Sequence, residues 1–96
     1  MPAYVIGRVN VEDPDGFTEY AQGVAATVEQ YGGRFRARGG KVEILEGDCP
    51  PRVALIEFES VEQAKRWYES AEYQALVTIR QRYSSADLVL VEGLEP

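Results

Sequence analysis

Three charged side chains, Arg8, Arg38 and Glu57, lie in strand-like segments. An arginine can hold a carboxylate or an enolate through charge-assisted hydrogen bonds, and a buried carboxyl group can exchange a proton. Together they would form an anion pocket in which Arg38 and Glu57 are the candidate catalytic residues and Arg8 is a further ligand-binding residue. The alternative, which is the more common use of such residues in small proteins, is an ion pair at an interface.

Arg38 has two expected placements. It precedes the glycines at 39–40, which permit a bend or a bulge. Its guanidinium can therefore meet Glu57 across a hairpin or point into a cavity at the edge of the sheet. Arg34, Arg36 and Arg38 alternate along the chain, but in a protein with a net charge of −6 such a row favours a solvated strand face over a phosphate site.

Aromatic side chains on the expected helices could line a cleft for a flat organic ligand. They are Tyr20, Trp67, Tyr68 and Tyr73. Trp67 and Tyr73 are candidate ligand-binding residues, and the alternative for both is a place in the hydrophobic core. A buried Tyr73 would need a partner for its hydroxyl.

The sequence has no histidine and one cysteine, Cys49. This removes the commonest general base and metal ligand, and the usual partner of a nucleophilic serine or cysteine. It also excludes the ordinary structural zinc patterns, and the glycines lack the spacing of a phosphate-binding loop. We expect no metal site and no cofactor. Beside Asp48, Cys49 is expected to be inert.

Composition and charge limit the partners. The 96 residues suit about one domain, and 45% apolar with 27% charged residues is ordinary for a folded protein. Ten basic against sixteen acidic side chains argue against nucleic acid. The longest apolar runs are far shorter than the ~20 residues that span a bilayer, and no charged-then-apolar leader is present. We expect no membrane association and a cytoplasmic location, which a single cysteine also fits.

Periodicity and turn signals predict the elements that must position these residues. Strands are expected at residues 3–11, 34–45 with an interruption at 39–40, 52–59 and 88–91. Helices are expected from Pro14, with Asp13 as N-cap and a stop at 32–33, and from a capping box at Ser60, with a break near Ser70. The order is βαββαβ.

This order predicts a single α+β domain, residues 1–96, of ferredoxin-like fold: a four-stranded antiparallel sheet with two helices on one face. The other face would carry Tyr4, Ile6, Val53 and Leu55, so we expect a second copy to cover it in a homodimer through the sheet face. The alternative is that a small domain simply tolerates exposed apolar surface.

Segments along nearly the whole chain resemble a small bacterial family called domain of unknown function 1330. They are Ala3–Ile6, Tyr31–Gly40, Leu45–Gly47, Pro51–Ser60 and Trp67–Gln74. That family is similar in fold to the dimeric α/β-barrel superfamily, in which two ferredoxin-like subunits join their sheets and some members are cofactorless monooxygenases, isomerases or haem enzymes. The resemblance implies the fold and the pairing, and assigns no activity.

Three functions stay open. The first is binding of a small anionic or aromatic metabolite. The second is a cofactorless monooxygenase- or isomerase-like enzyme, in which an electron-rich substrate such as a phenol or quinol supplies the reactivity while Arg38 and Glu57 steer charge and protons. The third is a dimer that only interacts with other proteins.

Overall fold

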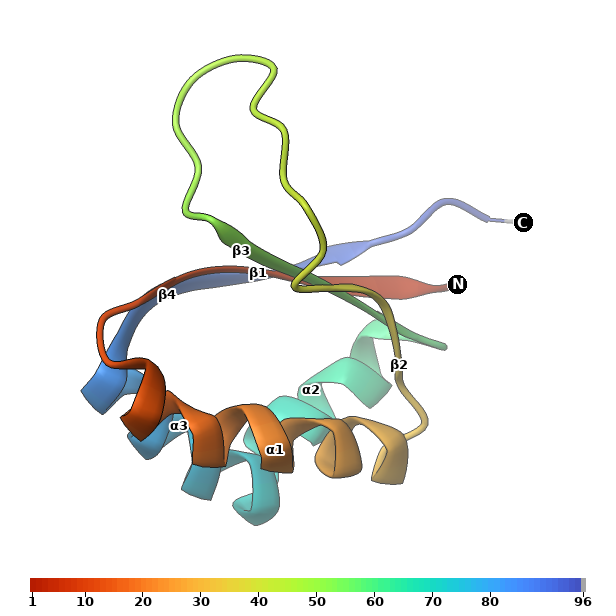
Figure 1. Ribbon diagram of the computed structural model, residues 1–96. Coiled ribbons are helices and arrows are strands. Elements are labelled where there is room, and N and C mark those ends of the chain that lie inside the picture. Colours follow the sequence, from red (N-terminus) through yellow and green to blue (C-terminus); the bar gives the residue numbers. More distant parts are fainter. Residues whose placement is uncertain (96) are drawn as a thin grey trace.

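Within residues 1–95, which the computed structural model describes, four antiparallel strands form one sheet with every helix on one side of it (Figure 1). The strands are β1 (Ala3–Val11), β2 (Arg34–Arg38), β3 (Arg52–Phe58) and β4 (Ser84–Glu92), in the order β2-β3-β1-β4. The helices are α1 (Pro14–Gln30), α2 (Val61–Glu69) and α3 (Ala71–Tyr83). The predicted α+β ferredoxin-like order is confirmed. Pro96, the last residue of the expected domain, lies outside the described residues.

Sequence signals set the ends of α1. The Asp13 carboxylate accepts hydrogen bonds from the backbone N–H groups of Asp15 and Gly16 at 3.2 and 3.3 Å, and Pro14 occupies the first helical position. The helix stops before Gly32, whose φ of +79° is in the left-handed region that favours glycine. The predicted cap and stop are therefore confirmed.

The second helical region is divided at Ser70, as predicted. The Ser60 hydroxyl accepts from the Gln63 amide at 3.1 Å and starts α2, but the Gln63 side chain does not complete the capping box. It donates instead to the Tyr31 carbonyl, which ties α2 to the end of α1. Ser70 has extended backbone, and its hydroxyl accepts from the Tyr73 amide at 3.1 Å to cap α3.

The strand predicted over residues 34–45 is wrong in its second half. β2 ends at Arg38, and residues 39–51 form a long loop that we call the arm. Gly39 and Gly47 have φ angles of +67° and +77°, which a regular strand does not contain. The arm rises from the sheet on the side opposite the helices (Figure 1).

β4 is longer than the strand predicted at 88–91. It begins at Ser84, directly after α3, and pairs with β1 from Val11↔Ser84 to Ala3↔Glu92. Residues 84–87 are polar or small and have little strand preference of their own. Their extended conformation comes from the ladder to β1, which local sequence patterns do not reveal.

The sheet irregularity expected at 39–40 lies instead in the middle of β2. Phe35 pairs with Ile56 and Ala37 with Leu55, so Arg36 is an extra residue in the ladder. The bulge moves Arg38 to the helix-covered face of the sheet, where it pairs with Ala54. The prediction that the three arginines share one strand face is therefore wrong for Arg38, which is nevertheless exposed.

The core lies between the helices and the sheet. Its largest fully buried side chains are Trp67, Tyr73, Phe58 and Val28. The rings of Trp67 and Tyr73 lie 4.0 Å apart between centroids, and the Trp67 indole N–H donates to the Thr27 hydroxyl at 3.0 Å. Both predicted aromatic candidates are thus core residues. Among the described residues, no helix is long and apolar enough to cross a membrane.

The other side of the sheet, which we call the helix-free face, carries an apolar band. On β1 and β3 it presents Tyr4, Ile6, Val53 and Leu55, which are half-buried. On β4 the side chains of Val89 and Val91 are 55% and 47% exposed. The alternation predicted for β1 and β3 is confirmed, and the band extends across β4.

Candidate functional site

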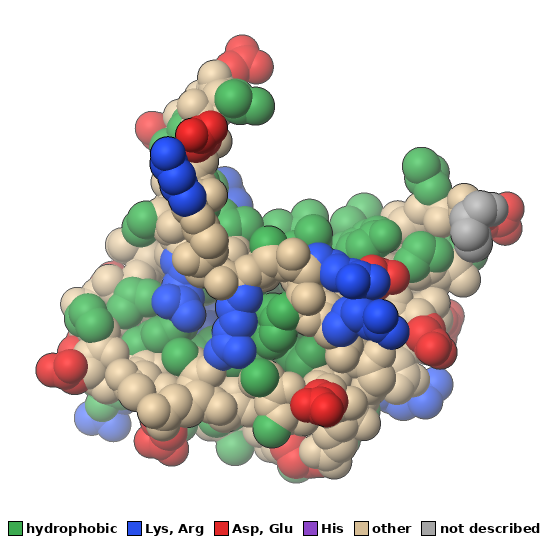
Figure 2. Space-filling view, turned by 45° about the vertical axis from the view of Figure 1, so that its right-hand side comes forward, with side chains coloured by type: hydrophobic (Ala, Val, Ile, Leu, Met, Phe, Trp, Pro, Cys, Tyr) green, Lys and Arg blue, Asp and Glu red, His purple; other side chains and the backbone are tan. Residues whose placement is uncertain are grey.

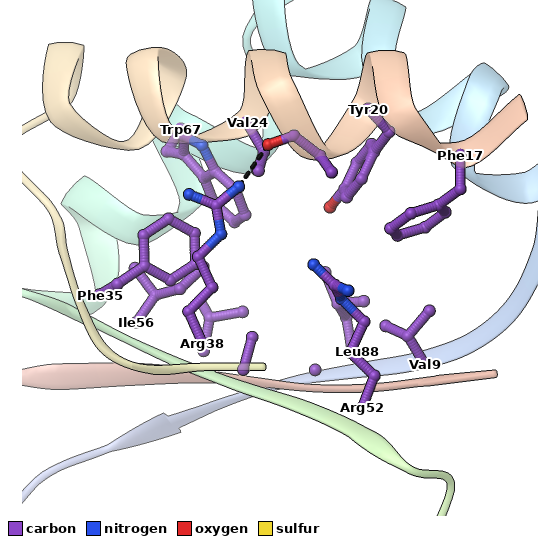
Figure 3. A pocket seen from close by; sticks show the side chains of 14 residues that line it. Val9, Phe17, Tyr20, Val24, Phe35, Arg38, Arg52, Ile56, Trp67 and Leu88 are labelled. Atoms are coloured by element: carbon purple, nitrogen blue, oxygen red, sulfur yellow. Dashed lines mark hydrogen bonds between the residues drawn. The ribbon is translucent and has the colours of Figure 1, made fainter. Parts of the chain in front are cut away.

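A narrow apolar slot lies between α1 and the sheet and opens where β2 ends and β3 begins (Figure 3). Its walls include Phe17, Val24, Phe35, Ile56, Trp67 and Leu88. The empty space is about 510 Å³ with the open mouth included. Figure 2 shows apolar surface below the arm with basic side chains beside it.

Two arginines stand at the mouth of the slot. Arg38 is the last residue of β2, and its guanidinium lies over the Phe35 ring at 4.7 Å from the centroid. Arg52 is the first residue of β3 and lies over the Phe17 ring at 5.3 Å. Figure 3 shows both guanidinium groups directed into the space between sheet and helix, where Arg38 also donates to the backbone carbonyl of Ala21. Stacking on the aromatic rings orients the two guanidinium groups and leaves their positive charge unneutralised.

Neither arginine of the mouth has a carboxylate partner in the described part of the chain. The ion pairs there join Arg8 to Asp87, Arg36 to Glu57, and Lys41 to Glu43. None of the acidic side chains in residues 1–95 lies within 4.0 Å of the Arg38 or Arg52 guanidinium nitrogens. Two guanidinium groups beside an apolar slot are suited to bind an organic anion.

A pair of tyrosine hydroxyls forms the inner polar group of the slot. The Tyr20 hydroxyl points into the slot (Figure 3) and lies 2.8 Å from the Tyr73 hydroxyl. Burial raises the pKa of Tyr20 and, together with the neighbouring Tyr20, that of Tyr73, so both stay protonated at neutral pH. When Tyr73 donates to Tyr20, the Tyr20 proton is free to bond an oxygen atom of a guest.

Arg80 adds a third positive charge behind Tyr20. Its side chain is 6% exposed, and its guanidinium carbon lies 5.8 Å from the centroid of the Tyr20 ring. Within residues 1–95 its Nε has no hydrogen-bond partner and its guanidinium has no carboxylate partner. The charges of Arg80 and Arg38 act against burial and favour the ionised form of Tyr20. The polar end of the slot is therefore electropositive.

The structure separates the two residues predicted to act together. Of the two placements expected for Arg38, the one in a cavity is found. The other, a contact with Glu57 across the hairpin, is wrong, because Glu57 lies on the helix-free face and its Oε1 accepts from Arg36 Nε at 2.7 Å. The bulge in β2 is the cause, since it turns Arg38 to the opposite face from Arg36.

The other candidates lie in three different places. Arg8 is on the helix-free face, where it is bonded to Asp87 at 3.0 Å. Trp67 lines the slot although it is fully buried in the core. Tyr73 does not line the slot but supports Tyr20 from behind. Of the aromatic residues expected to form a cleft, Tyr20 and Trp67 do so.

Sequence reasoning missed Arg52, Phe17 and Phe35 as residues of the slot. The sequence did carry a signal for Arg52. In a strand, alternate residues lie on the same face, so Arg52 shares a face with Ala54 and Ile56, which face the helices. An arginine at a core-facing position of a strand is unusual and marks a candidate site. No comparable signal existed for the two phenylalanines, which look like ordinary core residues.

The tyrosine pair leads to a prediction for alkaline pH. We expect Tyr20 and Tyr73 to ionise above the ordinary tyrosine pKa of about 10. Because these pKa values are raised in the folded state, the stability they contribute is complete below about pH 10 and is lost as the pH rises further.

Phenolate absorbance, followed from neutral to alkaline pH in the folded protein, checks this prediction. Two late-ionising groups are expected in the wild type and one in a Tyr73→Phe variant. Ionisation of Tyr20 and Tyr73 at the ordinary pKa of about 10 in the folded protein would contradict it.

The comparisons with known proteins agree with the fold. The model of the family Domain of unknown function (DUF1330) matches residues 2–94. No curated protein matches the chain in sequence.

Solved structures share the arrangement over nearly the whole chain. A protein of unknown function from Rhodopseudomonas palustris is 20% identical with a TM-score of 0.75, over 99% of this chain and 84% of that one. A dimeric ferredoxin-like protein of unknown function from Jannaschia sp. CCS1 is 13% identical with a TM-score of 0.78, over 97% and 100%. SnoaB from Streptomyces nogalater, a cofactor-independent oxygenase, is 14% identical with a TM-score of 0.72, over 99% and 95%. At these identities the likeness shows the fold alone.

Proposed function

Because the chain belongs to the family of domain of unknown function 1330, which names no activity, we propose from the slot's geometry that it is a homodimer that binds a small, flat organic anion between α1 and the sheet. The observation that carries this proposal is the pair of guanidinium groups, Arg38 and Arg52, beside an apolar slot. In a chain with a net charge of −6, a site with positive charge and no adjacent carboxylate favours an anionic guest.

The chemistry of the slot defines the guest. A carboxylate, enolate or phenolate oxygen would lie between the two arginines and accept a hydrogen bond from Tyr20. The ring that carries this oxygen would pack against Phe35 in the wall of the slot, which the buried Trp67 also forms. The narrow shape favours a single ring over a branched or bulky guest.

Homodimerisation through the helix-free face is the second part of the proposal. The apolar band includes Ile6, Leu55, Val89 and Val91, and a sheet face of this composition is normally covered. The neighbour of similar fold from Jannaschia is described as dimeric. A cytoplasmic location stays a prediction from the sequence.

Turnover of the guest without a cofactor is a second candidate function. It is favoured by the Tyr20 hydroxyl, which is directed into the slot beside positive charge, and by the fold shared with a cofactor-independent oxygenase. The arginines would stabilise the oxyanion of an acidic phenol or enol, and Tyr20 would donate to that oxygen. Glu57 would have no part, since it lies on the other face of the sheet.

Thermal melting at fixed protein concentration tests the binding proposal. Benzoate, hydroxybenzoates, phenols and quinols form the panel, with benzamide and acetate as controls that lack the charge or the ring. A guest at about 100 times its Kd adds roughly 2.7 kcal/mol, which raises the Tm by on the order of ten degrees in a domain of this size. Ring anions are expected to raise the Tm and the two controls are not.

An Arg66→Gln variant serves as the matched control, because it removes an exposed arginine of α2 that lies outside the slot and outside the helix-free face. Its response to the panel is expected to equal that of the wild type. Equal shifts with benzoate and benzamide, or no shift with any compound, would contradict anion binding in the slot. If no compound raises the Tm, the result would favour a dimer that only interacts with other proteins.

A further inference from the structure

The arm, residues 39–51, stands away from its own subunit. It projects on the helix-free side of the sheet in Figure 1. A Cβ atom placed on Gly39, Gly40 or Gly47 would meet no heavy atom within 4 Å. The ion pair between Lys41 and Glu43, at 3.3 Å, joins two exposed side chains of the arm itself. Loops of about this length without secondary structure are uncommon in compact domains, and they are usually either functional or disordered.

The outer part of the arm exposes two adjacent apolar residues, Ile44 and Leu45, between the acidic residues Glu43 and Glu46. Leu45 is 92% exposed and Ile44 is 54% exposed. Burial of these two neighbouring aliphatic side chains by a partner would stabilise the complex with that partner. The arm rises on the same side of the sheet as the exposed Val89 and Val91, which pair with Ile6 and Tyr4 of the helix-free face.

A second copy of the chain is the partner that the geometry favours. The hollow between the arm and the sheet is lined by Arg8 and Asn10 of β1, Ile44 and Cys49 of the arm, and Ser85 of β4, and measures about 830 Å³ with its open side included. Any body that covers the helix-free face also meets the arm, because the arm rises from that face. In a two-fold dimer each arm would then contact the other subunit.

The arm is joined directly to the slot at both ends. Arg38 immediately precedes it and Arg52 immediately follows it. The Gly39 N–H still donates to the Val53 carbonyl at 3.3 Å, so the arm leaves the sheet just beyond the slot's mouth. Immobilising the arm would therefore restrict the two residues that carry the slot's charge.

We propose that the arm clasps a second copy of this chain, with Ile44 and Leu45 as its anchor, and that the clasp holds Arg38 and Arg52 in position for the anion. This inference rests on the proposed homodimer and anion slot. It adds that each copy completes the slot of the other, because the dimer contact fixes the loop that connects the two arginines.

The test compares an Ile44→Ser, Leu45→Ser double variant with a Glu46→Gln control, which changes the next residue but keeps the apolar pair. Sedimentation equilibrium gives the dimer Kd, and benzoate titration at several protein concentrations gives the Kd of the slot. Circular dichroism confirms folding, which we expect because both replaced side chains are exposed.

The double variant is expected to raise the dimer Kd by at least about tenfold. Its benzoate affinity should fall at low protein concentration and recover when the protein concentration exceeds the new dimer Kd. The Glu46→Gln control should match the wild type in both measurements.

Three results would overturn the inference in different ways. An unchanged dimer Kd in the double variant refutes the clasp, whatever the slot binds. A variant monomer that binds benzoate as tightly as the wild-type dimer refutes the link to Arg38 and Arg52. A wild type that is monomeric at every concentration refutes both the clasp and the proposed homodimer. If the wild type is dimeric but does not bind benzoate, the proposed function of the slot is refuted. The clasp is then judged by the dimer Kd alone.

Discussion

A double variant, Arg38→Gln with Arg52→Gln, is expected to bind ring carboxylates about a hundredfold more weakly than the wild type. Each change removes a charge-assisted hydrogen bond to the anion, and such bonds contribute about 1.5 to 3 kcal/mol. We expect the lower figure because Arg38 is exposed and water screens its charge. About 1.4 kcal/mol is a factor of ten in Kd. Neither arginine pairs with a carboxylate in residues 1–95, so no acidic group loses a partner.

Titration calorimetry with benzoate at low and high salt measures this effect. The wild type should lose affinity as salt rises, and the double variant should respond less. Arg52→Lys keeps the charge but not the planar fork, and is expected to lie between the two. A double variant whose affinity stays within about twofold of the wild type would show that the anion is bound elsewhere.

Replacing Trp67 with alanine is expected to lower the free energy of unfolding by about 3–5 kcal/mol. The indole is fully buried between Phe58, at 5.5 Å between ring centroids, and Tyr73, at 4.0 Å. The change leaves a cavity beside the slot and removes the hydrogen bond to Thr27. Since small domains have about 5–15 kcal/mol of total stability, much of the protein would be unfolded at modest temperature.

Urea unfolding followed by circular dichroism, at one fixed protein concentration, measures this loss. Trp67→Phe should be much less destabilised because it keeps a ring in the cavity. Thr27→Val isolates the lost hydrogen bond, which is expected to account for about 1 kcal/mol. A loss below about 1 kcal/mol in Trp67→Ala would mean that the indole does not support the core.

The elements of this fold are readable from local chemistry. Asp13 with Pro14, and Ser60 and Ser70 as caps, define where helices begin, and the 3.6-residue stripe of α1 defines its buried face. The period-two alternation of β1 and β3 likewise separates the core-facing residues from the helix-free face. These signals depend only on neighbours in the sequence.

The candidate site was harder to predict because a single bulge in β2 determines which face of the sheet Arg38 occupies. In a regular ladder Arg36 and Arg38 would share one face, and Arg38 would lie on the side of Glu57. The extra residue at Arg36 depends on how β2 pairs with β3, a long-range contact that no local pattern marks. The same holds for the meeting of Tyr20 with Tyr73, which are far apart in the chain.

The central claim, that the slot binds a ring anion through Arg38 and Arg52, is tested most directly by the emission of Trp67. It is the only tryptophan in the sequence, and it lines the slot. Titration with benzoate is expected to give a saturable change in emission that benzamide does not give and that the Arg38→Gln, Arg52→Gln variant lacks. No saturable change with benzoate, or the same change with benzamide or in the variant, would contradict the claim.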